Sequence, residues 1–251
     1  MRIAALYDIH GNLPALEAVL EETHCEPVDQ IVVGGDVVPG PMPRETIDVL
    51  ARSAIPVRFV HGNGDREVLA LMSGLDTEWY RTAPEHWKAP VAWSAQQLEP
   101  LHRQTMAGWP LTCRIDHSEV GPILFCHATP QNDTDCFTRL TSDHRLVRLL
   151  GDVDTRLVVC GHTHMQFDRS VNGIQVVNAG SVGMPFGGVG AYWLLLGPAV
   201  QLRHTSYDLA DAARRIRATS YPGADEFAVR NVLNSPSADE MLELFGRAES
   251  V

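Results

Sequence analysis

IAALYDIHGN, the sequence of residues 3–12, joins an apolar run to a polar turn and sets a pattern that the chain repeats. The unbroken apolar run predicts a β-strand that is covered on both faces. Alternate side chains of a strand share a face, so Asp8 and His10 are expected to point together where this strand ends. The glycine that follows permits a tight turn, and Asn12 suits the N-cap of a helix over residues 13–20. An aspartate and a histidine so placed supply half of a metal site.

The same pattern of an apolar run followed by polar residues recurs along the chain. It is found at residues 30–36 (QIVVGGD), 56–65 (PVRFVHGNGD), 122–127 (PILFCH) and 155–164 (TRLVVCGHTH). Open α/β sheets place their ligands at the carboxyl ends of parallel strands, which is where these polar residues fall. The candidate metal ligands are Asp8, His10, Asp36, Asn63, His127, His162 and His164. Oxygen ligands mixed with imidazole suit Mn²⁺, Fe or Zn²⁺ better than Mg²⁺ or Ca²⁺.

Further hairpins and helices are predicted between these motifs. Antiparallel pairs are expected for strands 111–117 and 122–126, 166–171 and 174–177, and 191–196 and 200–206, and Asn172-Gly173 is a strong hairpin turn. Helices are expected over residues 44–52, 67–72, 91–103 and 143–150, the last one capped by Ser142.

Two further segments are predicted to be mainly helical. Residues 66–110 hold all but one of the five tryptophans. They are interpreted either as a helical layer that packs its aromatic side chains on the sheet, or as a cap that shapes a substrate cleft. The tail, residues 209–251, is expected to be helical with Asp208 and Ser237 as caps, and to serve packing or a subunit contact.

The composition indicates a globular protein without a basic surface. Of the 251 residues, 45% are hydrophobic and 20% charged, and the formal net charge is −11. This charge argues against stable nucleic-acid binding, although metal ions can still hold a small anionic substrate. The five cysteines form no C-x-x-C pair and are expected to be small core residues of a reduced protein. No signal segment or membrane-spanning run is visible, so a cytoplasmic location without membrane association is expected.

The ordered motifs resemble those of the calcineurin-like metallophosphoesterase superfamily. They are D-x-H from residue 8, G-G-D from 34, G-N-x-D from 62, a strand-terminal histidine at 127 and G-H-T-H from 161. NAGSVG at residues 178–183 is similar to a segment of the phosphodiesterase-like, YfcE-type branch. The resemblance implies an α/β (α+β) fold, a four-layer αββα sandwich of two mixed β-sheets flanked by helices. It assigns residues 1–207 to this domain, with 66–110 as a cap-like helical insertion and 208–251 as a helical extension.

The resemblance also implies a centre of two transition-metal ions, divalent or trivalent, with Mn preferred and Fe, Zn or Ni as alternatives. Asp8, His10 and His164 would hold the first ion, Asn63, His127 and His162 the second, and Asp36 would bridge both. The ions would lower the pKa of a shared water, so that hydroxide attacks phosphorus in line. The candidate catalytic residues are Asp36, Asn63 and Asp65, and the candidates for substrate binding are Asn12, Asn63 and Arg66. Asp65 is equally a candidate helix cap, and Arg66 either a phosphate clamp or an ordinary surface arginine.

Two positions depart from the family pattern. Gly64 replaces the histidine of the frequent G-N-H-D or G-N-H-E motif, so a general acid worth about 10²- to 10⁴-fold in rate is absent from its usual place. Phosphodiesters with acidic leaving groups are then favoured over alkyl phosphomonoesters. Phe186 stands where relatives of this size often have an arginine that binds anions. The other histidines that could supply the acid are His61, His86, His117 and His144, for each of which a structural or surface role is the simpler interpretation.

The expected function is dinuclear, metal-dependent hydrolysis of a small phosphodiester or nucleotide-like substrate. The alternatives are a phosphomonoesterase or dinucleoside polyphosphate hydrolase, and a non-catalytic protein-binding scaffold with the same fold. Scaffolds of this kind typically lose metal-binding histidines, and this chain retains them, which favours the enzyme. Assembly into a homo-oligomer stays open.

Overall fold

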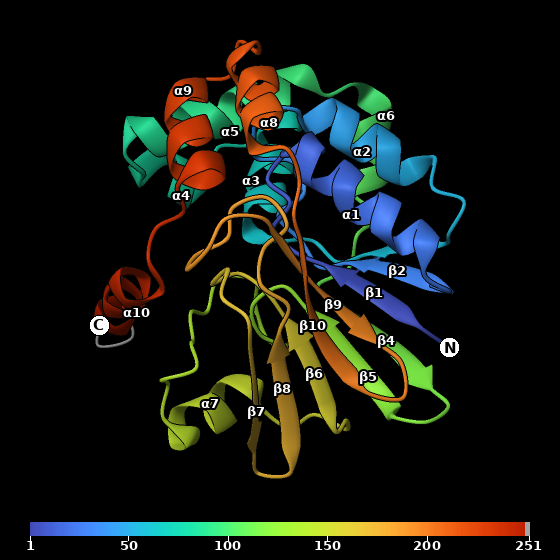
Figure 1. Ribbon diagram of the computed structural model, residues 1–251. Coiled ribbons are helices and arrows are strands. Elements are labelled where there is room, and N and C mark those ends of the chain that lie inside the picture. Colours follow the sequence, from blue (N-terminus) through green and yellow to red (C-terminus); the bar gives the residue numbers. More distant parts are fainter. Residues whose placement is uncertain (249–251) are drawn as a thin grey trace.

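Two five-stranded β-sheets face each other in the computed structural model, which describes residues 1–248 (Figure 1). Both sheets are mixed, since each contains parallel and antiparallel neighbours. Helices cover the outer sides of the sheets, most of them on the sheet that contains the N-terminus (Figure 1). The predicted sandwich of two mixed sheets between helices is therefore confirmed.

The first sheet has the strand order β10-β9-β1-β2-β3. Its strands are β1 (Ile3–Leu6), β2 (Gln30–Val33), β3 (Val57–Phe59), β9 (Ala191–Leu196) and β10 (Val200–Thr205). β1, β2 and β3 run parallel, and β9 and β10 form the predicted antiparallel pair. The carboxyl ends of the three parallel strands therefore lie side by side.

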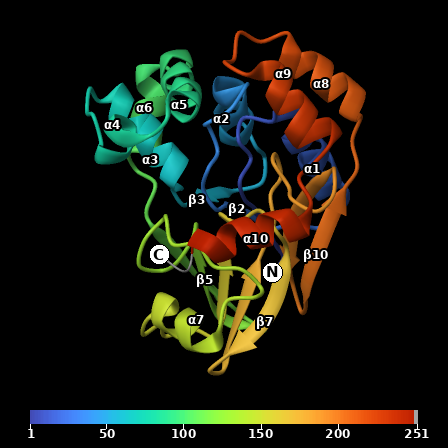
Figure 2. The ribbon, with the colours of Figure 1, turned by 90° about the vertical axis from the view of Figure 1, so that its left-hand side faces the viewer.

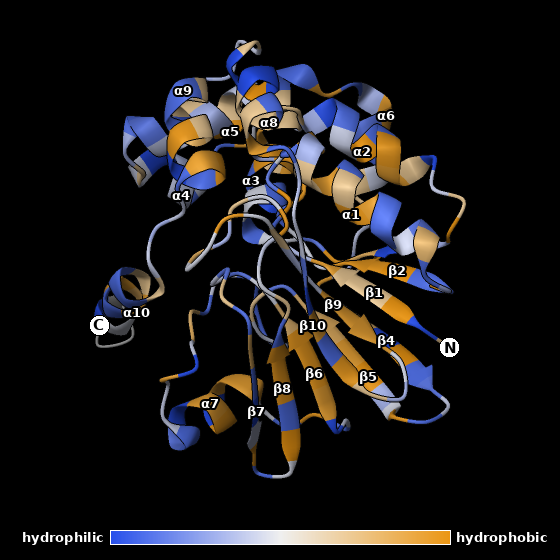
Figure 3. Cartoon of the chain, in the orientation of Figure 1, coloured by the Kyte–Doolittle hydropathy of each residue, from blue (hydrophilic) through white to orange (hydrophobic). Residues whose placement is uncertain are grey.

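The second sheet has the strand order β4-β5-β6-β8-β7. Its strands are β4 (Thr112–His117), β5 (Gly121–Cys126), β6 (Leu157–Cys160), β7 (Phe167–Val171) and β8 (Ile174–Asn178). β5, β6 and β8 run parallel in the centre, and the predicted hairpins β4–β5 and β7–β8 are present. Figures 1 and 3 show that the loops after β6 and β8 rise toward the loops of the first sheet.

β1 shows how the sequence fills both sides of a sheet. Ile3 and Ala5, followed by Tyr7, belong to the apolar cluster between the two sheets. Ala4 and Leu6 belong to the cluster under the helices on the outer side. All of these side chains are fully buried, and a large apolar side chain gains about 1.5–3 kcal/mol from such burial. The hydrophobic strands are coloured orange in Figure 3.

The helices in the described part of the chain are α1 (Leu13–Cys25), α2 (Pro43–Ala51), α3 (Asn63–Met72), α4 (Glu78–Thr82), α5 (Glu85–Gln97), α6 (Pro100–Met106), α7 (Asp143–Leu150), α8 (Leu209–Arg217), α9 (Ala224–Phe227), the π-helix η1 (Ala228–Leu233) and α10 (Ala238–Ala248). The predicted caps are confirmed: the side chains of Asn12, Ser142 and Asp208 accept a backbone hydrogen bond at the starts of α1, α7 and α8. Ser237 Oγ likewise accepts from the Glu240 N–H at the start of α10, at 3.2 Å.

Residues 66–110 hold most of α3 and all of α4 to α6, and the predicted helices here are corrected in their bounds. α4 was not predicted, and α5 begins at Glu85 instead of residue 91 and contains Pro90. The helix expected over 91–103 is two helices, because the chain is extended at Leu98 and Glu99, just before Pro100. Trp109 stacks on Phe59 with 4.7 Å between ring centroids, as expected for a layer packed on the sheet. Trp79 and Trp87, in contrast, are exposed. The aromatic residues are thus only partly used in packing.

The C-terminal tail packs on the first sheet's helices. Ile216 of α8 and Val232 of η1 share a buried cluster with Leu13 and Met42. α10 is set apart from α8 and α9 and lies near the loops at the strand ends (Figures 1 and 2). It is tied there by a hydrogen bond from the Gly187 N–H to the Pro236 carbonyl, at 2.8 Å. Residues 249–251 of the predicted helical tail lie outside the described residues.

The cysteines are less uniform than expected. Cys113, Cys126 and Cys160 are buried, but Cys25 is exposed at the end of α1 and Cys136 is half-buried in a loop. The expectation that all five are core residues is therefore wrong for two of them. Among the described residues, no helix is long and apolar enough to span a bilayer.

Candidate metal centre

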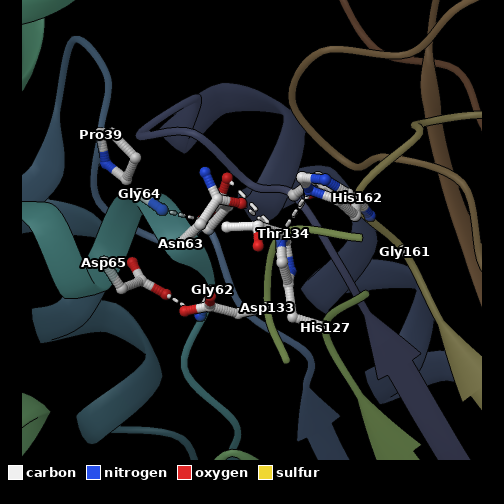
Figure 4. A network of polar contacts seen from close by, with 12 residues as sticks. Pro39, Gly62, Asn63, Gly64, Asp65, His127, Asp133, Thr134, Gly161 and His162 are labelled. Atoms are coloured by element: carbon white, nitrogen blue, oxygen red, sulfur yellow. Dashed lines mark hydrogen bonds and ion pairs between the residues drawn. The ribbon is translucent and has the colours of Figure 1, made fainter. Parts of the chain in front are cut away.

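The loops at the carboxyl ends of both sheets converge on one group of polar side chains. Asp8 and His10 follow β1, Asp36 follows β2, Asn63 begins α3, His127 follows β5, and His162 and His164 follow β6. All but His10, Asn63 and His162 are buried. The structure thus brings together every residue that the sequence predicts as a metal ligand. Figure 4 shows Asn63, His127 and His162 side by side in this group.

Several of these residues have an uncommon backbone conformation. Asp8, His10, Asp36, His162 and His164 have φ angles of 52°, 49°, 50°, 66° and 57°, in the left-handed region. Such angles cost free energy for residues other than glycine, and they persist at functional sites where the surroundings fix them. Here the fixing contacts include the hydrogen bond from the His10 N–H to the Asp36 carbonyl, at 2.9 Å. The turns direct side chains from different strands toward one point.

The first cluster contains Asp8, His10 and His164. His164 Nε2 lies 3.3 Å from Asp8 Oδ1 and 3.3 Å from His10 Nε2. His10 Nε2 is 4.0 Å from Asp8 Oδ1. The three ligand atoms are therefore close enough to bind one ion together.

The second cluster is centred on His127. Its Nε2 lies 3.1 Å from Asn63 Oδ1 and 3.1 Å from His162 Nδ1. Asp36 lies between the clusters, with Oδ2 at 3.8 Å from His10 Nε2 and 3.7 Å from His127 Nε2. This position is the one that a bridging carboxylate requires. Asp8 Oδ1 also comes within 3.9 Å of His127 Nε2, so both carboxylates face both clusters.

The donor set fits a pair of cations. Asp8 Oδ1 is buried and accepts no hydrogen bond from the described residues. Asn63 Oδ1 faces only acceptors, namely His127 Nε2, His162 Nδ1 and the Asp133 carbonyl, all near 3.1 Å. Lone pairs that converge in this way repel one another unless the amide turns over or a cation lies among them. The arrangement therefore has the chemistry of a metal site.

The space around both carboxylates depends on glycine. A Cβ atom at Gly62 would lie 2.2 Å from Asp36 Oδ1, and one at Gly161 would lie 2.4 Å from Asp8 Oδ2. Neither distance is tolerated between nonbonded atoms. The glycines of the G-N-x-D and G-H-T-H motifs are thus required by the close approach of the carboxylates.

Three of the histidines are oriented by backbone carbonyl groups. Nδ1 of His10, His127 and His164 lies 3.2, 3.0 and 2.7 Å from the carbonyl oxygens of Pro39, Gly34 and Met184. A carbonyl only accepts, so each Nδ1 carries the proton and each Nε2 offers a lone pair to the centre. His162 is reversed, with Nδ1 toward the centre and Nε2 at 3.4 Å from Cys136 Sγ. The sequence marks Cys136 only by its place in a polar loop.

The charges of the cluster shift the pKa values of its residues in both directions. Burial lowers the pKa values of His127 and His164, but Asp8 and Asp36 outweigh burial and raise them. Burial raises the pKa of Asp8, but His164 and the other histidines outweigh burial and hold this pKa well below its usual range. Burial and the charge of His127 lower the pKa of His162 to about 4. Asp8 is therefore an anion and His162 a neutral imidazole near pH 7, the forms that bind metal.

Asp65 is a buried positioning residue. Its Oδ2 accepts from the Gly62 N–H at 3.1 Å, and its Oδ1 accepts from the Val37 N–H at 2.9 Å. It thus caps α3 and ties the loop after Asp36 to the segment that carries Asn63. Burial and the charge of Asp36 raise the pKa of Asp65 to about 7. A catalytic role for Asp65 stays a prediction, because its carboxylate accepts hydrogen bonds from backbone N–H groups.

The two proposed substrate-binding side chains beside Asn63 are engaged in protein contacts. Arg66 donates from Nε and Nη2 to the Asp133 carboxylate, at 2.8 and 3.1 Å. Asn12 is fully buried, and its amide donates to the Gly183 carbonyl at 2.9 Å. Substrate binding by Arg66 or Asn12 therefore stays a prediction that these contacts do not support. Figure 4 shows Asp133 close to the start of α3.

The position of the missing general acid is sterically closed. A Cβ atom at Gly64 would lie 2.5 Å from Pro39 Cγ, and Figure 4 shows these residues next to each other. The Gly64 N–H instead donates to Asp36 Oδ1 at 2.7 Å. Of the other histidines, His117 is held by the Met1 carbonyl at 2.7 Å, and His61 Nδ1 lies 3.4 Å from Asp133 Oδ2.

Phe186 covers one side of the centre. Its ring stacks on that of His164, with 4.9 Å between centroids and 20° between planes. Phe245 of α10 lies next to Phe186, with 6.4 Å between centroids. The position that is often an arginine in relatives is therefore part of an aromatic edge beside a candidate ligand.

Comparison with known sequences identifies the family of the chain. Residues 1–197 match the family model described as the calcineurin-like phosphoesterase superfamily domain. An uncharacterised protein of Methanocaldococcus jannaschii is 26% identical over 205 residues, which cover 74% of this chain and 78% of that protein.

Solved structures also resemble the chain over most of its length. A metallophosphoesterase from Sphaerobacter thermophilus is 25% identical with a TM-score of 0.69, covering 92% of this chain and 97% of that one. A hypothetical protein from Pyrococcus horikoshii OT3 shares the fold, with a TM-score of 0.75 at 20% identity over 90% of this chain and 97% of its own.

Proposed function

The chain belongs to the calcineurin-like phosphoesterase superfamily, and from this premise we propose that it hydrolyses a small phosphodiester with the help of two bound metal ions. The observation that carries the proposal is the convergence of ligand atoms around Asp36. Its Oδ2 lies 3.8 Å from His10 Nε2 and 3.7 Å from His127 Nε2, between the two clusters. A buried carboxylate oxygen between two sets of imidazole nitrogens is placed as a ligand shared by two ions would be.

The proposed ligands follow the two clusters. Asp8, His10 and His164 would hold one ion, Asn63, His127 and His162 the other, and Asp36 would contact both. When bound, the two ions would activate water and neutralise charge on the phosphoryl oxygens. The protein's own contribution is to hold these side chains in place before substrate arrives. Manganese is the proposed metal, and iron, zinc and nickel suit the same mixed donor set.

The diester preference rests on Gly64. A phosphomonoester with an alkyl leaving group needs a proton donor at the leaving oxygen, and no side chain is present at this position. A diester with an acidic leaving group needs that donor less. Since the chain has a net charge of −11, binding of an anionic substrate would depend on the metal ions rather than on a basic surface.

The test compares bis-p-nitrophenyl phosphate with p-nitrophenyl phosphate, with added Mn²⁺ and with a chelator, for the natural chain and for Asp36→Asn. We expect metal-dependent hydrolysis that is faster on the diester and is lost in the variant. A preference for the monoester would support the phosphomonoesterase alternative. Two bound ions without hydrolysis of either ester would contradict this proposal and favour the protein-binding scaffold.

The domain division is proposed on the same basis. Residues 1–207 would form the catalytic domain, with 66–110 as its cap-like insertion and 208–251 as a helical extension. Support comes from the site, since every candidate ligand lies before residue 165. The extension contributes α10 and its Phe245, which lies near Phe186 at the edge of the centre.

A further inference from the structure

We propose that Cys136 is a positioning residue for His162: its sulfur accepts the proton on Nε2 and so fixes the tautomer whose Nδ1 faces the metal centre. The inference rests on the proposed metal centre, because it assigns a partner to one of the ligands named there. The observation is the distance of 3.4 Å between Cys136 Sγ and His162 Nε2. Ring nitrogens that do not bind metal usually donate to an outer partner, which fixes the orientation of the ring.

His162 needs a partner of a different kind from the other histidines. Backbone carbonyls hold the Nδ1 atoms of His10, His127 and His164, so these rings present Nε2. His162 presents Nδ1, which lies 3.1 Å from His127 Nε2. A neutral imidazole has a single N–H, and the nitrogen that faces the ion must keep its lone pair. The proton of His162 is thus on Nε2, which faces the thiol of Cys136.

The geometry around the thiol suits an acceptor. Its hydrogen can point to the Thr134 carbonyl, which lies 3.8 Å from Sγ. A sulfur lone pair is then directed at the imidazole N–H. Sulfur is a weaker acceptor than a carbonyl oxygen, but it is large and polarisable, and 3.4 Å is within hydrogen-bonding distance for sulfur.

The loop that carries Cys136 is fixed from both sides. The Asn132 side chain accepts from the N–H groups of Thr134 and Asp135, at 3.0 and 2.8 Å. On the other side, Thr163 Oγ1 donates to the Phe137 carbonyl at 3.2 Å. That bond joins the residue after Cys136 to the residue after His162. The sulfur and the imidazole are therefore held against each other by their own chain neighbours.

The experiment measures binding of Mn²⁺ to the metal-free protein by calorimetry, for Cys136→Ala and Cys136→Ser. Serine keeps a hydrogen-bond acceptor and alanine does not. We expect alanine to weaken one of the two binding events by about 10- to 100-fold, as is usual for outer partners of metal ligands, and serine to restore most of the affinity. Cys25→Ala is the matched control, since Cys25 is exposed and lies at the end of α1. It should bind like the natural chain.

A second readout tests the tautomer directly. A long-range ¹H–¹⁵N spectrum of the natural metal-loaded protein, with a diamagnetic ion such as Zn²⁺, should show His162 protonated at Nε2. Thermal melting of the metal-free variants shows whether Cys136→Ala unfolds the protein. If it does, the Mn²⁺ affinity of Cys136→Ser still tests the proposal, because this variant keeps an acceptor.

The inference is overturned if alanine binds both ions like the natural chain, if serine and alanine lose affinity equally, or if His162 is protonated at Nδ1. Failure of the proposed function gives a different result. In that case the natural chain binds two ions with the expected dependence on Cys136 but hydrolyses no phosphoester. A natural chain that binds fewer than two ions overturns both.

Discussion

The carboxylate of Asp8 accepts a hydrogen bond from the backbone N–H of His162, with 2.8 Å between Oδ2 and N. Asp8 follows β1 in one sheet, and His162 follows β6 in the other. The bond fixes Oδ2 and leaves Oδ1 in the centre without a hydrogen-bond donor among the described residues. One side chain thus joins the two sheets and directs an oxygen at the place proposed for a metal ion.

Replacement of this carboxylate tests the metal centre. We expect Asp8→Asn to lower Mn²⁺ affinity by more than about 100-fold, since a direct ligand should matter more than the ~10–100-fold typical of outer partners. Hydrolysis of the diester should fall in parallel. Asp154→Asn is the matched control, because the Asp154 side chain is fully exposed. Calorimetry measures the Mn²⁺ affinity of both variants. If Asp8→Asn binds Mn²⁺ as tightly as the natural chain, Asp8 is not a ligand.

A side chain at position 64 should be costly. In Gly64→Ala the new methyl would lie 2.5 Å from Pro39 Cγ and 3.0 Å from Asp36 Oδ1, so the loop after β2 must move. Overpacking of this kind typically destabilises by about 1–3 kcal/mol. Urea unfolding measures the effect, with Gly108→Ala as control, since its nearest contact would be an ordinary 3.4 Å. We further expect Gly64→His to bring no gain in monoesterase activity. A gain would show that the loop adapts.

The Asp133 carboxylate should make stability depend on pH. Burial raises the pKa of Asp133, but the nearby His61 ring and the hydrogen bonds from Arg66 outweigh burial and hold this pKa well below its usual range. A lowered pKa in the folded state stabilises the fold above the unfolded value of about 3.9, and this stability is lost as pH falls through the folded pKa.

We therefore expect Asp133→Asn to be less stable than the natural chain by about 1.5–3 kcal/mol at pH 7, the range for hydrogen bonds to charged groups. The difference should shrink as pH falls below about 4. Chemical unfolding across this pH range measures it, beside the exposed control Asp154→Asn. A difference that is independent of pH would assign the effect to packing instead of charge.

Metal removal should lower the melting temperature. Binding to the folded state alone stabilises by about 2.7 kcal/mol per site when the free ion is at 100 times its dissociation constant. For a chain of this size, each kcal/mol shifts the melting temperature by roughly 2–4 °C. We expect a chelator to lower it and Mn²⁺ to restore it, with little effect of Mg²⁺ because imidazole ligands disfavour that ion. Identical melting with and without chelator would argue against bound metal.

Much of the fold follows from local signals in the chain. Apolar runs that end in glycine and polar residues predict buried strands, and Asn12, Ser142 and Asp208 mark helix starts through their own hydrogen bonds. The break between α5 and α6 was missed, although Pro100 disfavours helical geometry in the residue before it.

For the candidate site too, local sequence determines some features and the packing of the chain determines others. The sequence by itself determined which side chains occupy the strand ends, because the D-x-H, G-G-D, G-N-x-D and G-H-T-H motifs tie each polar residue to a local turn. The order of these motifs resembles that of the calcineurin-like family, and the family match over residues 1–197 shows that the chain belongs to it.

Only the tertiary structure decided what surrounds those side chains. Arg66 pairs with Asp133, 67 residues away, although the sequence suggested a phosphate clamp or a surface role. Cys136 meets His162 across 26 residues, and Phe186 stacks on His164. Such contacts depend on how two sheets pack and how far each loop turns, which are sums of many weak, long-range interactions. Local turns follow from the residues within them, whereas the partners of a ligand depend on the whole fold.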